Sequence, residues 1–150
     1  MTPLKVFIVT ELASGGELLE RVVENGNFSE SDARSVIYQV LKGMEYLHSK
    51  NIVHRDLKLE NILLSDGSSS AIVKIADFGL ARFFADDSQL RTICGSPLYV
   101  APEILDIGAN METYTPAVDM WSIGVMLYIL LSGNSPFENE DEQSLFQMIR

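Results

Sequence analysis

The polar stretch His54-Arg55-Asp56-Leu57-Lys58-Leu59-Glu60-Asn61 constrains the fold of this chain more than any other feature. Before it, Ser29 is a predicted helix N-cap, and apolar residues recur at three- and four-residue steps as far as Leu47. After it, Ile62-Leu63-Leu64 and Ile72-Val73-Lys74-Ile75 are typical of short strands. A continuous helix would scatter the polar groups around its axis, whereas a loop braced at both ends can aim them at one point. We therefore expect a braced polar loop at the centre of the fold.

Three side chains of this loop have complementary chemistry. Asp56 is a candidate base or hydroxyl-orienting group, Lys58 a candidate phosphate-facing cation, and Asn61 a candidate metal-binding oxygen. Transfer of a phosphoryl group to a hydroxyl requires these three roles. The stretch also fits the pattern H-R-D-L-x-x-x-N in full. The alternative is a charged turn that fits by accident, which other motifs in the chain can test.

Two further motifs follow in a fixed order, Asp77-Phe78-Gly79 and then Ala101-Pro102-Glu103. With all three motifs present, the chain resembles the eukaryotic protein kinases. Lys58 and Gly95-Ser96-Pro97 are typical of the serine/threonine branch, and the stretch 91–95 is most similar to the calcium/calmodulin-dependent and checkpoint kinase group.

The resemblance implies a mainly α fold with short β hairpins, similar to the large (C-terminal) lobe of a protein kinase with the small lobe missing. Residues 1–150 would be one partial kinase domain containing the hinge, the catalytic loop, the activation segment and a central buried helix. No Gly-rich phosphate loop and no V-A-I-K lysine precede Val6, so we expect those parts before Met1. We therefore expect little kinase activity from these 150 residues alone.

The chain opens with Val6-Phe7-Ile8-Val9, which predicts a buried strand, and a glycine-containing turn follows at 10–16. The resemblance makes this turn the hinge between lobes; the alternative is a strand–turn–helix joint without a ligand. The residues that the resemblance assigns to ATP are the gatekeeper Thr10, the adenine-binding backbone of Glu11 and Ala13, the ribose-facing Glu17, Glu60, and Leu63 beneath the adenine.

The resemblance also assigns a Mg²⁺ site to Asn61 and Asp77, which should lie at adjoining ends of neighbouring strands. Two protein oxygens with phosphates and waters suit Mg²⁺. Glu17 and Glu60 are further candidates to attract a basic residue upstream of the acceptor serine or threonine; the alternative is that both are ordinary exposed carboxylates.

The segment from Asp77 to Glu103 matches an activation loop, and Arg55 would meet a phosphate on it. Thr92 and Ser88 are the nearest acceptors, and we predict Thr92 as the regulatory site. By resemblance, Ser96 lines the site of the substrate hydroxyl.

A buried helix is predicted around Met120 to Leu131, which is too short to span a bilayer and apolar enough to be buried on all sides. The resemblance implies that Asp119 accepts hydrogen bonds from the backbone of His54 and Arg55. We place His48 near the end of the helix that follows the predicted N-cap Ser29, and we assign it no chemistry.

A formal net charge of -10 argues against nucleic acid and anionic membranes as partners. The single cysteine fits a reducing compartment, and no signal peptide is visible, so we expect an intracellular protein, cytoplasmic or nuclear.

The function predicted from the sequence is transfer of the ATP γ-phosphoryl group to serine or threonine hydroxyls of protein substrates. One alternative is a truncated, inactive fragment or pseudokinase that acts through protein contacts. A second is a small-molecule phosphotransferase, which Asp77-Phe78-Gly79 and Ala101-Pro102-Glu103 together disfavour.

Overall fold

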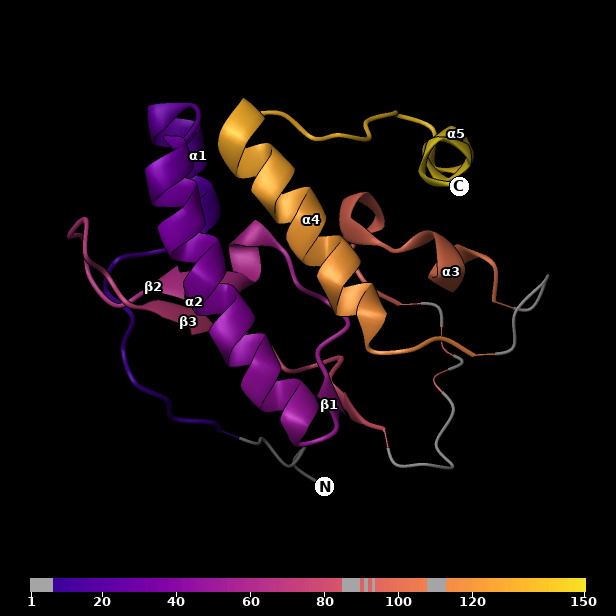
Figure 1. Cartoon of the computed structure of the whole chain (residues 1–150), viewed down its shortest axis with the longest axis horizontal. Coiled ribbons are helices and arrows are strands. Elements are labelled where there is room, and N and C mark those ends of the chain that lie inside the picture. The colour runs from indigo at the N-terminus through magenta and orange to yellow at the C-terminus, as the bar shows by residue number, and fades with distance from the viewer. Residues whose placement is uncertain (1–6, 85–89, 91, 93, 108–112) are drawn as a thin grey trace, which may run out of the picture.

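The computed structural model describes residues 7–84, 90, 92, 94–107 and 113–150 (Figure 1). Helices dominate this part of the chain, and the predicted class, mainly α with short antiparallel β pairs, is confirmed. The helices are α1 (Leu18–Asn25), α2 (Glu30–Ser49), α3 (Pro102–Leu105), α4 (Ala117–Ser132) and α5 (Glu142–Ile149), with short 3₁₀ turns η1 (Leu59–Asn61) and η2 (Pro97–Tyr99). The strands are β1 (Ile52–Val53), β2 (Ile62–Leu64), β3 (Val73–Ile75) and β4 (Arg82–Phe83).

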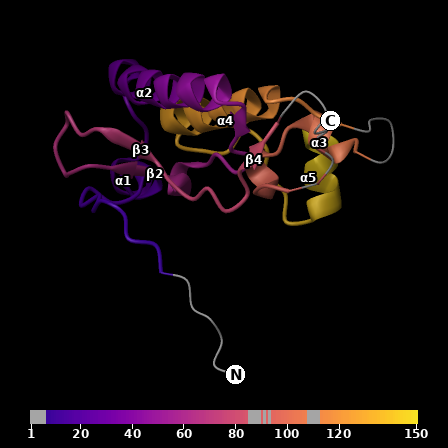
Figure 2. The ribbon, with the colours of Figure 1, turned by 90° about the horizontal axis from the view of Figure 1, so that it is seen from below.

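The start of α2 follows from its N-cap. Ser29 Oγ accepts a hydrogen bond from the Asp32 backbone N–H at 3.1 Å, which satisfies one of the free donors of the first turn. The predicted apolar face is also present, with Ala33, Ile37, Val40 and Met44 buried. This face directs α2 against α4, and the two helices lie side by side in both views (Figures 1 and 2).

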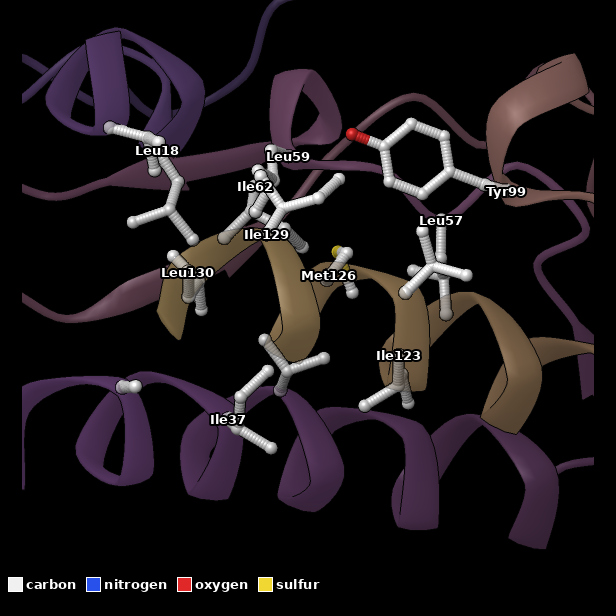
Figure 3. Packing of buried hydrophobic residues seen from close by; sticks show 14 of the residues in the cluster. Leu18, Ile37, Leu57, Leu59, Ile62, Tyr99, Ile123, Met126, Ile129 and Leu130 are labelled. Atoms are coloured by element: carbon white, nitrogen blue, oxygen red, sulfur yellow. The ribbon is translucent and has the colours of Figure 1, made fainter. Parts of the chain in front are cut away.

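A first hydrophobic core joins α1, α2 and α4 to the polar loop (Figure 3). Leu57 and Leu59 are fully buried beside Ile62, Met126 and Leu130. Because the loop alternates leucines with Asp56, Lys58 and Glu60, every second side chain anchors it while the intervening ones stay free for chemistry. The polar loop is therefore braced as the sequence predicted.

A second core lies around α3, α5 and the first turns of α4. Its fully or nearly buried members include Val53, Ile104, Val118 and Leu145. Leu98, Trp121 and Phe137 contact both cores, and the Trp121 and Phe137 rings stack with centroids 5.9 Å apart. These three side chains connect the two cores.

The prediction of a buried strand at 6–9 is wrong for its described residues. Phe7, Ile8 and Val9 are 83%, 84% and 94% exposed and have no strand structure; Val6 lies outside the described residues. Among the described residues no strand pairs with this segment, so nothing covers its apolar side chains. Figure 2 shows it extending away from the helices.

The prediction that α4 is buried on all sides is also wrong. Met120 and Tyr128 are 47% and 50% exposed, and they border an open apolar hollow of about 370 Å³ that Pro136 and Phe137 also line. The sequence is apolar around the whole helix, but the elements that pack against it, α2 and η2 among them, leave Met120 and Tyr128 uncovered. In the described part of the chain, no helix combines the length and apolarity that a membrane span requires.

Candidate active site

Asp119, in the first turn of α4, holds the backbone of the polar loop. Its carboxylate is 1% exposed and accepts hydrogen bonds from the backbone N–H groups of His54 (3.0 Å) and Arg55 (2.9 Å). Arg55 has a positive φ of 70°, a conformation that costs a non-glycine residue free energy and needs such support. The anchoring role that the resemblance implied for Asp119 is confirmed.

His48 is a third partner of this carboxylate, and the sequence did not indicate this contact. Its Nε2 lies 2.8 Å from Asp119 Oδ2, although the two residues are 71 positions apart. The sequence did contain one signal, because a buried aspartate requires several donors. It did not show which side chain would supply the third one.

His54 joins the polar loop to the strand that precedes Asp77. The Asp56 backbone N–H donates to His54 Nδ1 (3.3 Å), so Nδ1 is an acceptor and the Nε2–H donates to the Ala76 carbonyl (3.0 Å). The His54 ring also contacts the Phe78 ring edge-on, with centroids 5.0 Å apart. The first two predicted motifs are therefore in direct contact.

Four predicted site residues surround one point. Ser96 Oγ donates to Asp56 Oδ1 at 2.9 Å and accepts from Lys58 Nζ at 2.9 Å. Lys58 Nζ lies 3.6 Å from Asp56 Oδ2, and Asn61 Nδ2 lies 3.3 Å from the same oxygen. A hydroxyl, a carboxylate, an ammonium and an amide thus meet in a partly buried position.

Asn61 and Asp77 leave the adjoining ends of β2 and β3. These strands pair antiparallel, with Ile62 opposite Ile75, and the Ala76 N–H donates to the Asn61 carbonyl at 2.8 Å. Asn61 Nδ2 also donates to the Asp56 carbonyl at 2.8 Å, which leaves its Oδ1 available to a cation. Asp77 has a positive φ of 57° and accepts from the Gly79 N–H through Oδ1.

The described residues contain no group of three or more His, Cys, Asp or Glu side chains that could hold a metal ion. A site built on Asn61 and Asp77 would need ligands from outside the protein, which is the usual situation of Mg²⁺ bound with a nucleotide. The donor set therefore fits Mg²⁺ with phosphate oxygens.

The residues predicted to face the nucleotide fall into two groups. Glu17 forms an isolated antiparallel bridge with Leu63, so these two lie together at the start of α1. Thr10, Glu11 and Ala13 have no regular structure. The Glu11 carboxylate instead pairs with Lys74 of β3 at 3.0 Å, a contact that the sequence did not predict.

Glu60 lies on η1, which packs against α1. The Tyr99 hydroxyl donates to its Oε2 at 3.5 Å. Burial, and then the charge of Glu60, raise the pKa of Tyr99 well above its ordinary value, so this hydroxyl remains a donor at neutral pH. The Tyr99 hydroxyl is thus a long-range donor to the Glu60 carboxylate.

Arg55 and Thr92 are connected through a residue that was not predicted. Arg55 Nη1 donates to the Tyr114 hydroxyl at 3.1 Å, and that hydroxyl donates to the Thr92 carbonyl at 3.0 Å. The Thr92 side chain is exposed; Ser88, the other predicted acceptor, lies outside the described residues.

Comparison with known proteins gives a consistent result. The family model described as the protein kinase domain matches residues 1–150. Myosin light chain kinase A of Dictyostelium discoideum is 46% identical over 99% of the chain, and calcium/calmodulin-dependent protein kinase type IV of Mus musculus is 48% identical over 99%. The ovarian-specific serine/threonine-protein kinase Lok of Drosophila melanogaster is 44% identical over 99%. The matches cover 49%, 31% and 31% of these relatives, so the chain spans half of their length or less.

Proposed function

Because the chain belongs to the protein kinase family, we propose that the full-length protein transfers the γ-phosphoryl group of ATP to serine or threonine hydroxyls of protein substrates. One observation carries this proposal: the Ser96 hydroxyl lies 2.9 Å from both the Asp56 carboxylate and the Lys58 ammonium. A hydroxyl in this position has a proton acceptor on one side and a cation on the other. This is the environment that an acceptor hydroxyl needs.

In this proposal Asp56 orients the acceptor hydroxyl and takes its proton, while Lys58 neutralises charge on the phosphoryl group during transfer. Ser96 keeps both side chains at hydrogen-bonding distance and lines the site of the substrate hydroxyl. Asp119 supports all three by holding the loop backbone. Positioning and charge neutralisation supply most of the catalysis of such reactions.

Asn61 and Asp77 would hold Mg²⁺, which supplies neutralisation of the phosphate charge when bound. Their departure from adjoining strand ends supports this assignment. Glu17 and Leu63 would contact the nucleoside, with Thr10 and the backbone of Glu11 and Ala13 completing the adenine side.

Thr92 would be the regulatory phosphorylation site and Arg55 its partner. A phosphate adds about two negative charges and three acceptors, enough to order a segment against a guanidinium. The connection from Arg55 through Tyr114 to Thr92 supports this pairing.

Glu17 and Glu60 would attract a basic residue upstream of the acceptor serine or threonine. The contact of the Tyr99 hydroxyl with Glu60 supports the role of Glu60.

For residues 1–150 alone we expect little phosphotransfer. The side chains from Phe7 to Leu12 are exposed, so little of the described chain packs against the segment that we assign to the adenine side. This exposure supports a second candidate function, that of an inactive protein that acts through protein contacts. Robust ATP turnover by the 150 residues would contradict this expectation.

The proposal is tested by measuring phosphate transfer from labelled ATP with Mg²⁺ to serine- and threonine-containing peptides, using the full-length protein. Asp56→Asn should lower kcat by about 10²–10⁴-fold, because the proton acceptor is lost. Glu24→Gln, the same chemical change at an exposed position of α1, should leave kcat unchanged. No transfer by the unsubstituted protein, phosphorylated at Thr92 or not, or undiminished transfer by Asp56→Asn, would overturn the proposal.

A further inference from the structure

Tyr114 lies between two parts of the chain that the proposed reaction depends on. It is 5% exposed, and its backbone N–H donates to the Leu90 carbonyl at 3.1 Å, in an isolated antiparallel bridge between the two residues. Its side chain enters the second hydrophobic core. The ring is therefore held by packing, and the hydroxyl has a fixed position.

The hydrogen-bonding capacity of this hydroxyl is fully used. It donates its one proton to the Thr92 carbonyl (3.0 Å) and accepts from Arg55 Nη1 (3.1 Å); Cys94 Sγ lies 3.8 Å away at the remaining acceptor position. Burial raises the pKa of Tyr114, so the proton needed for Thr92 is present at neutral pH. One oxygen thus connects the catalytic loop to the segment that carries Thr92.

Arg55 has neutral partners at this point. Its side chain is 8% exposed overall, and it donates to the Leu80 carbonyl and the Tyr114 hydroxyl. Among the described residues no carboxylate lies within ion-pair distance of it. A nearly buried cation with neutral partners is poorly compensated, and a phosphate would bind it more strongly than a hydroxyl does.

The same two segments also touch through backbone. Gly95 has a positive φ of 108°, and a Cβ there would lie 2.9 Å from the Arg55 carbonyl. This approach fixes the segment on one side of Thr92 and Cys94, while the Leu90–Tyr114 bridge fixes it on the other. Between these two points the Tyr114 hydroxyl is the side-chain contact that joins Thr92 to Arg55.

We propose that Tyr114 is a positioning residue: its hydroxyl holds the backbone at Thr92 against Arg55 and serves as the neutral partner of that guanidinium until Thr92 is phosphorylated. The inference rests on the proposed function and specifies how its regulatory contact is prepared. Because a phosphate supplies stronger, charged acceptors, the Tyr114 hydroxyl matters most in the unphosphorylated protein.

The first test needs no phosphotransfer. Cys94 is the single cysteine of the 150-residue chain and is half-buried, so a rise in the rate of its reaction with dithionitrobenzoate reports further opening of this segment. Tyr114→Phe should raise the labelling rate about tenfold, because one buried hydrogen-bond centre is lost. Tyr128→Phe, the same change on the exposed face of α4, should leave the rate unchanged.

Labelling is repeated at low urea concentrations to separate local from global opening. A local opening gives a rate that changes little with urea, whereas global unfolding gives a steep dependence. An unchanged rate for Tyr114→Phe, or a rise as steep in urea as global unfolding, would overturn the inference.

The second test uses the full-length protein with and without phosphate on Thr92. Tyr114→Phe should lower kcat of the unphosphorylated form about tenfold and that of the phosphorylated form much less, because the phosphate replaces the lost partner. Equal losses in both forms would mean a merely structural role and overturn the inference. Absence of transfer by the unsubstituted protein would instead overturn the proposed function. The labelling experiment would then still show whether the Tyr114 hydroxyl holds the segment at Thr92 against Arg55.

Discussion

At the scale of single residues, Asp119 shows how one buried charge organises a reactive loop. Its two oxygens receive three donors from residues that are more than 60 positions away in the chain. A carboxylate buried to this extent is stable only with such compensation. The cost of burying it is offset by a loop backbone that is held before any substrate binds.

Asp119→Asn should therefore lower the free energy of unfolding by about 3 kcal/mol, since an amide cannot accept from all three donors. The measurement is the midpoint of urea unfolding at unchanged m-value. Glu24→Gln removes an exposed carboxylate of α1 and should change the free energy by no more than about 0.5 kcal/mol. Equal midpoints for Asp119→Asn and the unsubstituted chain would show that the network contributes nothing to stability.

The residues of the loop itself could be predicted because their spacing is local. Asp56, Lys58 and Asn61 lie within one stretch, and Ser96 belongs to a short motif of its own, so a pattern along the chain identifies all four. His48 and Tyr114 could not be identified in this way. Their roles arise from contacts with Asp119 and Arg55, 71 and 59 positions away, and no periodicity connects such positions.

At the scale of elements, the N-cap and apolar face of α2 and the β2–β3 pair followed from sequence, because helix caps and apolar periodicity act over a few residues. The exposure of α4 and of Phe7–Val9 did not follow. Whether an apolar face is covered depends on which other elements reach it, and that is a property of the assembled fold.

Two glycines, one within α4 and one at its C-cap, test the local energetics of this helix. Gly124 lies on the exposed face with open space where a Cβ would be, whereas Gly133 caps the helix with a positive φ of 76°. Gly124→Ala should raise the free energy of unfolding by about 0.5–1 kcal/mol through helix propensity. Gly133→Ala should lower it by about 1–2 kcal/mol through backbone strain.

Thermal or urea unfolding of the two variants is the measurement, and each serves as the control for the other. A loss of stability in Gly124→Ala would contradict the open space at this position. A gain in Gly133→Ala would contradict the left-handed cap.

At the scale of the whole molecule, the two hydrophobic cores determine whether the chain unfolds as one unit. Leu98, Trp121 and Phe137 contact both, so loss of one core exposes side chains that support the other. Trp121 is the single tryptophan of the chain and stacks on Phe137, which makes its fluorescence a reporter placed between the cores. We expect one cooperative transition.

Leu130→Ala in the first core and Ile104→Ala in the second should each lower the free energy of unfolding by about 2–5 kcal/mol. Both should shift the same transition, followed by Trp121 fluorescence and by far-ultraviolet circular dichroism. Met148→Ala, at a half-exposed position of α5, is the control and should cost no more than about 0.5 kcal/mol. Two separated transitions would show that the cores are independent.

The described part of the chain has three non-glycine residues with positive φ, namely Asn51, Arg55 and Asp77. Asn51 lies directly before β1, Arg55 lies within the polar loop, and Asp77 lies two residues after β3. Substitution of these residues by glycine would relieve backbone strain and could be selected in a screen for thermal stability. Under the proposed function, selection for stability at these sites would therefore lower the transfer rate, because glycine lacks the side chains of Arg55 and Asp77 and does not restrict the backbone to the positive φ that directs them.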